Sequence, residues 1–274
     1  MLDNREQLLD HLEKIGDWEK DQTGLWFWEK LGRLPFKLID KLTPAFIQEK
    51  IALLVTEVGN YIQTGGQYLV NEKAMVDKIA MATGRPVETV LEIGEIPLDD
   101  MISLSESLQN SRVKLATMQG ASTGVGGIFT LAIDIPLILG MALKTLQEIA
   151  IIHGYEPNNK QERIFIIKCL QFASADVVGK EAILKELSTI HENKQTEKNM
   201  ISQLQGWQEV FFTYRDNFGM KKLFQMIPIA GILFGAYANK SMMTDIAEAG
   251  IMLYRKRRIY EKLTVLDPHE NELK

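Results

Sequence analysis

Residues 120–143 read GASTGVGGIFTLAIDIPLILGMAL, and Asp134 is the one charged residue in this stretch. The run is long enough to cross the ~30 Å hydrocarbon core of a bilayer. However, four of its first eight residues are glycines, and Pro136 interrupts it. Proline removes a backbone donor and clashes with the preceding turn, which costs roughly 3 kcal/mol inside a helix. We therefore predict two helices here, joined as a bent apolar hairpin.

Asp134 and Pro136 are predicted to mark the break in this hairpin. The Asp134 carboxylate could cap the second helix, which would stabilise its ionised form. Alternatively, it is a carboxylate of raised pKa in apolar surroundings, able to accept a proton or hold an ion. The second helix would run from Ile135 or Pro136 to His153. Gly154 would end it, because glycine tolerates the left-handed conformation found at helix C-termini.

A second apolar stretch, MIPIAGILFGAYA, occupies residues 226–238, and Pro228 is predicted to open the last long helix there. It is shorter than the ~20 residues that a membrane-spanning helix needs. Both stretches contain glycines four residues apart, which share one helix face and allow close backbone approach in membranes and in soluble bundles. The predicted helix-packing residues are Gly120, Gly124, Gly126, Gly127, Gly231 and Gly235.

Elsewhere, apolar residues recur at the spacing of a helix rather than at that of a strand. Such stripes occupy residues 7–15 and 47–62, and the second follows Pro44, a residue suited to the first helical turn. We therefore predict an all-α fold: a single multi-helix domain with a glycine-rich apolar helical hairpin and an N-terminal amphipathic arm. The expected parts are the arm at 1–46, the helical domain at 47–263 and a disordered tail at 264–274.

Composition narrows the classes of function. The chain has 274 residues, of which 46% are hydrophobic and 24% charged, as in folded globular proteins. A net charge of −5 gives no general attraction to nucleic acid. Cys169 is the one cysteine, so an intrachain disulfide is excluded and a reducing compartment is expected. The charged N-terminus lacks the apolar core of a signal peptide, so we expect a cytoplasmic protein.

Neither a metal nor a cofactor is expected. The histidines stand singly, and no two have the spacing of metal ligands. His153, at the end of a predicted helix, is explained by favourable interaction with the helix dipole. The glycines at 126–127 are not followed by the Lys-Ser/Thr pair of a phosphate-binding loop.

Two further regions favour contact with a membrane. Tryptophans in the N-terminal arm alternate with lysines and arginines, as in helices that lie at a bilayer interface. The same aromatic residues could instead clamp the arm onto the helical domain. The basic run at 255–258 could attract anionic lipid at ~1 kcal/mol per charge, or form a solvated helix end. The predicted membrane contacts are Trp26, Trp28, Arg255, Lys256, Arg257 and Arg258.

One motif suggests an enzyme instead. Gly120-Ala-Ser122-Thr-Gly124 matches the Gly-x-Ser-x-Gly pattern of a hydrolase nucleophile elbow, and Asp134 and His153 follow in the hydrolase order. The elbow requires a β-strand before Ser122, whereas residues 111–118 have the pattern of a helix or loop. We favour a non-enzymatic protein that binds inner-membrane lipid or a membrane protein. A serine hydrolase using Ser122 and a soluble regulatory or scaffold module are the alternatives.

The order of several motifs resembles that of the EcsC family of bacterial proteins. The residues that carry the resemblance are Ile96-Pro97-Leu98, 120–127, Asp134-Ile-Pro136, His153-Gly154-Tyr155, Glu162-Arg163, 227–239 and Tyr254–Arg258. The resemblance covers roughly residues 18–263. The family is named for a product encoded beside an ABC transporter, so the resemblance implies a transporter-associated role. It implies no agreed biochemical activity. Our own expectation for localisation is a cytoplasmic protein that associates peripherally with the inner face of the plasma membrane.

Overall fold

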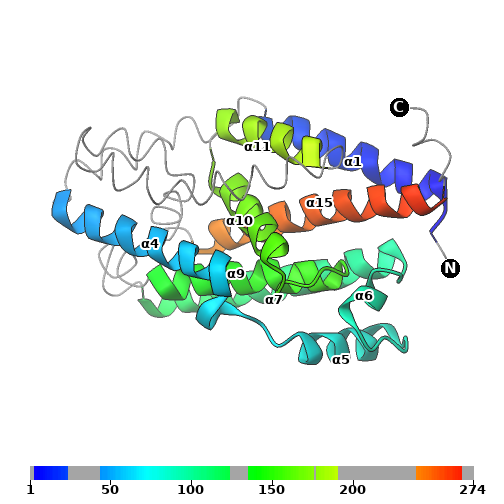
Figure 1. Ribbon diagram of the computed structural model, residues 1–274, viewed down its shortest axis with the longest axis horizontal. Helices are drawn as coiled ribbons and strands as arrows, with labels where there is room; N and C mark the ends of the chain where they lie inside the picture. The colour runs from blue at the N-terminus through cyan, green and yellow to red at the C-terminus, as the bar shows by residue number, and fades with distance from the viewer. Residues whose placement is uncertain (1–2, 24–43, 124–134, 176, 191–238, 267–274) are drawn as a thin grey trace.

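The structure is a computed structural model of the chain, and it describes residues 3–23, 44–123, 135–175, 177–190 and 239–266. Within these ranges it contains nine α-helices, one short 3₁₀-helix and no strand, which confirms the predicted all-α class (Figure 1). The helices are α1 (Arg5–Thr23), α4 (Pro44–Thr64), α5 (Glu72–Thr83), α6 (Val90–Ile93), α7 (Leu98–Thr123), α9 (Ile135–Ile152), α10 (Lys160–Ser174), α11 (Val177–Ile190) and α15 (Asn239–Leu266), with the 3₁₀-helix η1 (Gly66–Tyr68).

Helix α15 is central to the described body, and it packs against α1, α7, α9 and α10. Its Tyr254 and Ile259 are fully buried in a hydrophobic core to which helices from α1 to α15 contribute. Gly250 lies where α15 meets α9. A Cβ atom there would come within 2.6 Å of Leu146 and 3.2 Å of Ile149. Glycine at this position therefore allows the two helices to approach closely.

Local sequence explains most helix boundaries. Helix α4 begins at Pro44, as the sequence predicts. The side chains of Asn71 and Asn159 accept backbone hydrogen bonds at the starts of α5 and α10, and so satisfy donors that a first turn leaves unpaired. Helix α5 ends at Gly84, whose φ of 65° is in the left-handed region. These signals act within a few residues, and so they can be recognised in the sequence.

The predicted hairpin lies only partly within the described ranges. Helix α7 continues through Gly120 to Thr123, and α9 begins at Ile135 with Pro136 as its second residue. The start and the end of the predicted second helix therefore agree with the structure. The following predicted site residues lie outside the described ranges: Trp26, Trp28, Gly124, Gly126, Gly127, Asp134, Pro228, Gly231 and Gly235. Their packing, capping and membrane roles stay predictions.

Two elements differ from the predictions. Helix α15 continues to Leu266, so residues 264–266, predicted as the start of a disordered tail, are helical. The Thr264 hydroxyl donates a hydrogen bond to the Tyr260 carbonyl at 2.9 Å, and the helix-breaking Asp267-Pro268 pair follows only after Leu266. Helix α6 was not predicted, because a helix of four residues is too short to show a periodic pattern.

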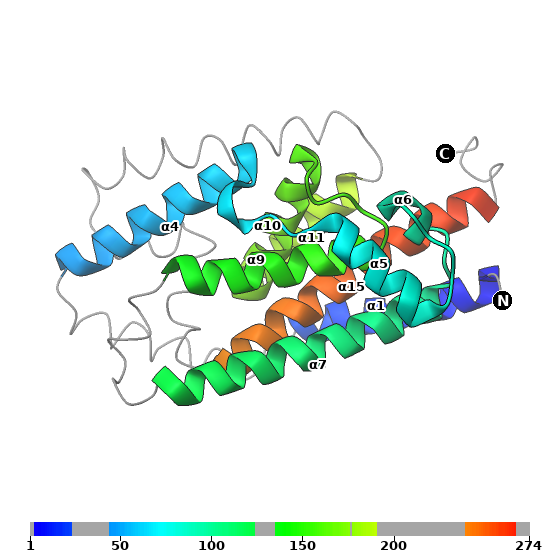
Figure 2. The ribbon, with the colours of Figure 1, turned by 90° about the horizontal axis from the view of Figure 1, so that it is seen from below.

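Three helix ends lie together at one end of the body. Helix α7 ends there, and α9 and α15 begin there, since α7 runs antiparallel to the other two (Figures 1 and 2). An ion pair between Arg112 of α7 and Glu148 of α9 fixes their relative register. Beyond Arg112, α7 runs on for 11 residues, or about 16 Å at 1.5 Å per residue. We call residues 112–123 and 135–145 the α7–α9 end.

Candidate functional site

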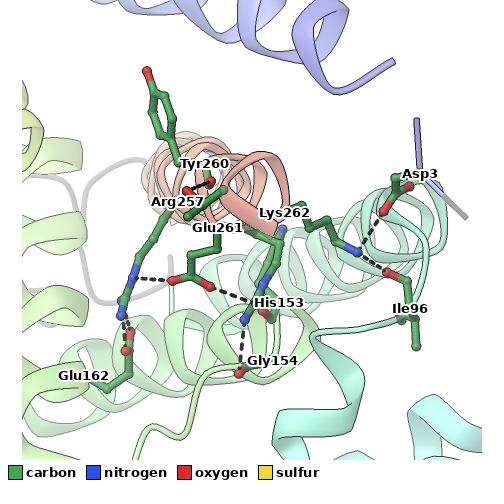
Figure 3. A network of polar contacts seen from close by, with 11 residues as sticks. Asp3, Ile96, His153, Gly154, Glu162, Arg257, Tyr260, Glu261 and Lys262 are labelled. Carbon is green, nitrogen blue, oxygen red and sulfur yellow. Dashed lines mark hydrogen bonds and ion pairs between the residues drawn. The ribbon is translucent and has the colours of Figure 1, made fainter. Parts of the chain in front are cut away.

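Polar and charged side chains gather at the opposite end of α9, where α15 passes α10 (Figure 3). Three motifs that are far apart in the sequence meet here: residues 153–155 at the end of α9, residues 162–163 of α10 and residues 254–258 of α15. We call the following residues the polar cluster: His153, Tyr155, Glu162, Tyr254, Arg257 and Arg258.

Arg257 and Glu162 form a largely buried ion pair at the centre of this cluster. Arg257 Nη1 donates to both carboxylate oxygens of Glu162, at 3.2 and 2.9 Å, and the Tyr254 hydroxyl donates to Oε1 at 2.6 Å. The guanidinium also lies 4.0 Å from the ring centroid of Tyr155. Burial is the largest single effect and acts to lower the pKa of Arg257, but the pKa is raised because Glu162, with smaller contributions from Tyr155, Tyr254 and Glu261, acts in the other direction. The pair therefore stays charged and ties α15 to α10.

Arg258 binds the C-terminal end of α9. Its Nε donates to the carbonyl of His153 at 2.8 Å, and its Nη2 donates to the carbonyl of Gly154 at 3.3 Å. Its guanidinium lies 4.5 Å from the ring centroid of Tyr155. The last carbonyls of a helix carry the negative end of its dipole, so a cation placed there is stabilising. Arg258 thus caps α9 from another helix.

Gly154 ends α9 with a φ of 78°, in the left-handed conformation that the sequence predicts. The backbone N–H groups of residues 154 and 155 bond back to the last turn of α9 at 2.9 Å each, which forms a Schellman cap. A Cβ atom on Gly154 would come within 2.5 Å of the backbone of Gly94 and 2.9 Å of Arg258 Nη2. The end of α9 and the corner between α6 and α7 therefore touch backbone to backbone.

His153 is completely buried, and its ring faces Tyr254 at a centroid distance of 6.0 Å. Its Nδ1 lies 2.8 Å from the Ile149 carbonyl, so Nδ1 carries the proton, and Nε2 has no partner among the described residues. Burial, and then the charges of Arg258 and Arg255, lower the pKa of His153 to about 4. The expectation that His153 itself offsets the helix dipole is wrong, because the ring is neutral near pH 7 and Arg258 supplies the cation.

The other two cations of the basic run face α1. Lys256 Nζ donates to both carboxylate oxygens of Glu19, at 2.7 and 2.8 Å. Arg255 Nη2 lies 2.7 Å from His11 Nδ1. All four side chains at 255–258 therefore have partners within the chain. Contact with anionic lipid, which the structure does not test, would have to compete with these partners.

The geometry around Ser122 contradicts the hydrolase alternative. Ser122 lies in the last turn of α7, so a helix and not a β-strand precedes it. His153 adjoins Gly154, which touches Gly94 just before the start of α7. The 26 residues of α7 span about 39 Å. Ser122 and His153 thus lie at opposite ends of the body, and they cannot form the hydrogen-bonded pair that a nucleophile elbow needs.

Three other features can be checked against the structure: metal binding, the Cys169 thiol and membrane-spanning helices. In the part of the chain that the structure describes, no three His, Cys, Asp or Glu side chains are grouped to hold a metal ion. Burial, followed by the charge of Glu162, raises the pKa of the Cys169 thiol well above its ordinary value. No helix among the described ranges is long and apolar enough to cross a bilayer. What the polar cluster does chemically is to hold α9, α10 and α15 together.

Comparison with known proteins gives a family match over most of the chain. The model of the EcsC protein family matches residues 10–259. The chain is 54% identical over 262 residues to "Uncharacterized protein YdbA" of Bacillus subtilis (strain 168), across 95% of this chain and 96% of that protein. It is 30% identical over 215 residues to "Protein EcsC" of the same organism, across 78% of this chain and 82% of that protein. No solved structure matches the chain significantly.

Proposed function

Because this chain belongs to the EcsC protein family, we propose that it is a non-enzymatic protein that attaches to the inner face of the plasma membrane through its α7–α9 end. In this proposal the contact is with lipid, and it is peripheral rather than spanning. A transporter-associated role, which the family resemblance implies, would place the protein at the same membrane.

The observation that supports this proposal is where the two apolar stretches join the described body. Residues 124–134 connect the end of α7 to the start of α9, and residues 226–238 directly precede α15. Those three helix ends lie together (Figures 1 and 2). Two apolar stretches that are about 100 residues apart in the sequence therefore attach at one end of the molecule. A concentration of apolar sequence at one end suits partial entry into the interfacial region of a bilayer.

Side chains in the last turns of α7 support the same end as the contact. Leu115 and Met118 are three residues apart, so they lie on one face of the helix. They are 47% and 64% exposed. Single exposed apolar side chains are ordinary on a protein surface, but these two adjoin a long apolar stretch and so would extend an apolar surface at this end. The polar cluster, in contrast, lies at the far end of α9, where its charges are paired.

A fluorescent probe at this end tests the proposal. Cys169 is completely buried, so a cysteine introduced by Met118→Cys can be labelled selectively with the polarity-sensitive dye NBD. The matched control is Val265→Cys, because Val265 is 79% exposed near the other end of α15. With vesicles that contain phosphatidylglycerol, the emission maximum of the probe at position 118 should shift to shorter wavelength, and a quencher attached to the lipid should reduce its fluorescence. The probe at position 265 should do neither.

Each other outcome has a definite meaning. If the protein floats with the vesicles but the probe at position 118 stays in water, the α7–α9 end is not the contact and the proposal is wrong. If the protein does not float with vesicles of any composition, the soluble regulatory or scaffold alternative is favoured instead.

A further inference from the structure

Helix α1 is attached to the body by few apolar side chains. Leu8 and Ile15 are 1% and 0% exposed, and the Trp18 ring lies 5.4 Å from that of Phe172. By comparison, eleven of the 15 residues of α10 are buried. Helix α1 packs mainly on α15 and α11 (Figure 1). Its removal would leave the contacts among α7, α9, α10 and α15 in place.

Polar contacts follow α1 from one end to the other. They join Asp3 to Lys262 (2.8 Å), His11 to Arg255 (2.7 Å), Trp18 to Glu248 (2.8 Å), Glu19 to Lys256 (2.7 Å) and Gln22 to Lys180 (2.6 Å). We call the residues that receive α1 the α1 seat: Phe172, Lys180, Glu248, Arg255, Lys256 and Lys262. The seat thus offers lysines to carboxylates, and a carboxylate to the indole N–H.

These polar contacts fix which helix binds the seat and in which register, more than they add to the free energy of its binding. The side chains of Lys256 and Glu19 keep 26% and 17% of their surface in solvent. The net contribution of such a partly buried ion pair to stability is small, because the cost of desolvation offsets much of the attraction. They do fix the register of the bound helix, because a shifted helix would place Glu19 away from Lys256. A helix that is held in this way can be exchanged for another helix with the same pattern.

We propose that the α1 seat is a binding site for an acidic amphipathic helix of a partner protein, and that α1 fills this site until such a helix displaces it. The pattern that the seat recognises is given by Leu8, Ile15, Trp18 and Glu19: two apolar residues seven apart, an aromatic residue three further on, and a carboxylate next to it. The proposal does not depend on lipid contact by the α7–α9 end, which uses other residues.

Competition by α1 sets the affinity that a partner needs. A segment tethered to its own binding site acts at an effective concentration on the order of 1 mM. If the intrinsic Kd of α1 for its seat is about 10 μM, a free helix will bind the intact protein roughly 100-fold more weakly than it binds the empty seat. Substitutions that release α1 from the seat should increase the affinity of the protein for a free helix by much of this factor. The experiment measures this increase in affinity.

The test uses a fluorescein-labelled peptide of residues 3–23 and the full-length protein, with binding followed by fluorescence anisotropy. Ile15→Asp should release α1 from the seat, because it places a charge at a fully buried position. Leu9→Asp is the matched control: it adds the same charge to the same helix at a residue that is 41% exposed. We expect the Ile15→Asp protein to bind the peptide at least about 10-fold more tightly than the Leu9→Asp protein or the unmodified protein.

A charge swap tests whether the seat recognises the pattern. The peptide with Glu19→Lys should lose about 10-fold in affinity for the Ile15→Asp protein. Adding Lys256→Glu to that protein should restore the binding of this peptide. Binding that is insensitive to both changes would be non-specific and would overturn the proposal, as would a folded Ile15→Asp protein that binds no peptide.

A second variant decides the matter if Ile15→Asp does not fold. Lys256→Glu alone alters only a partly exposed residue, so the protein should keep its helical circular dichroism spectrum. It should prefer the Glu19→Lys peptide over the unchanged peptide by about 10-fold. Equal binding of the two peptides would overturn the proposal.

Discussion

Gly154→Ala should destabilise the protein by about 4 kcal/mol, and the structure separates two causes of this loss. The first is backbone strain, because the φ of 78° at Gly154 costs a residue with a Cβ atom about 1–2 kcal/mol. The second is collision, because that atom would lie 2.5 Å from the backbone of Gly94 and 2.9 Å from Arg258 Nη2. Moving Arg258 away would weaken its two bonds to α9, and hydrogen bonds to a charged group are worth about 1.5–3 kcal/mol each.

Gly84→Ala is the matched control, because Gly84 also has a left-handed backbone, with a φ of 65°, but a Cβ atom there meets nothing within 4 Å. It should cost only the strain of about 1–2 kcal/mol. Gly94→Ala tests a collision without backbone strain: its φ of −57° is ordinary, while its Cβ atom would lie 3.0 Å from both Arg258 Nη1 and the Leu91 carbonyl oxygen.

The assay is urea unfolding of the three variants and the unmodified protein, followed by far-ultraviolet circular dichroism. Linear extrapolation gives each free energy of unfolding if the slopes agree. The expected order of destabilisation is Gly154→Ala, then Gly94→Ala or Gly84→Ala. Equal losses at Gly154 and Gly84 would refute the claim that the α9 end and the α6–α7 corner are in backbone contact.

Two further changes test the charged groups. Arg257→Met leaves Glu162 buried without its cation and should cost about 3–5 kcal/mol in urea unfolding. Arg85→Met, which breaks the more exposed pair with Asp100, should cost less than about 1 kcal/mol; similar costs would mean that the buried pair is not structural. Burial, with a smaller contribution from Glu248, raises the pKa of Asp245 from 3.8 to about 6, so ionisation of Asp245 destabilises the folded state as pH rises through this range. Asp245→Asn should therefore stabilise the protein above about pH 7, by at most about 3 kcal/mol at 1.36 kcal/mol per pKa unit. It should have little effect on stability near pH 4. Urea unfolding midpoints that shift equally at both pH values would contradict this prediction.

The elements of the fold that sequence predicts are those set by local chemistry. Pro44 and Pro136 occupy the first turns of α4 and α9, and Gly84 and Gly154 follow the ends of α5 and α9. Each signal depends on the backbone preference of one residue. The contact between Gly154 and Gly94 depends instead on how α9 packs against residues 60 positions earlier, and no local pattern specifies that.

The role of the basic run could not be read from its composition. Four adjacent cations suggest a solvated or lipid-facing surface, but successive residues of an α-helix point about 100° apart, at 3.6 residues per turn. Arg255 and Lys256 face α1, whereas Arg257 and Arg258 face α10 and α9. Apolar neighbours on the second face, such as Tyr254, are the signal in the sequence that part of the run is buried.

The division of these cations between two sides of α15 has a consequence for motions of the native state. Detachment of α1 would break bonds made by Arg255 and Lys256 but none made by Arg257 or Arg258. Backbone amides of α1 should therefore exchange with deuterated water through local opening, whereas those of α10 should exchange only when the whole body unfolds. Helix α15 therefore belongs to two units that open separately. The unit formed with α9 and α10 stays folded while α1 detaches and rebinds.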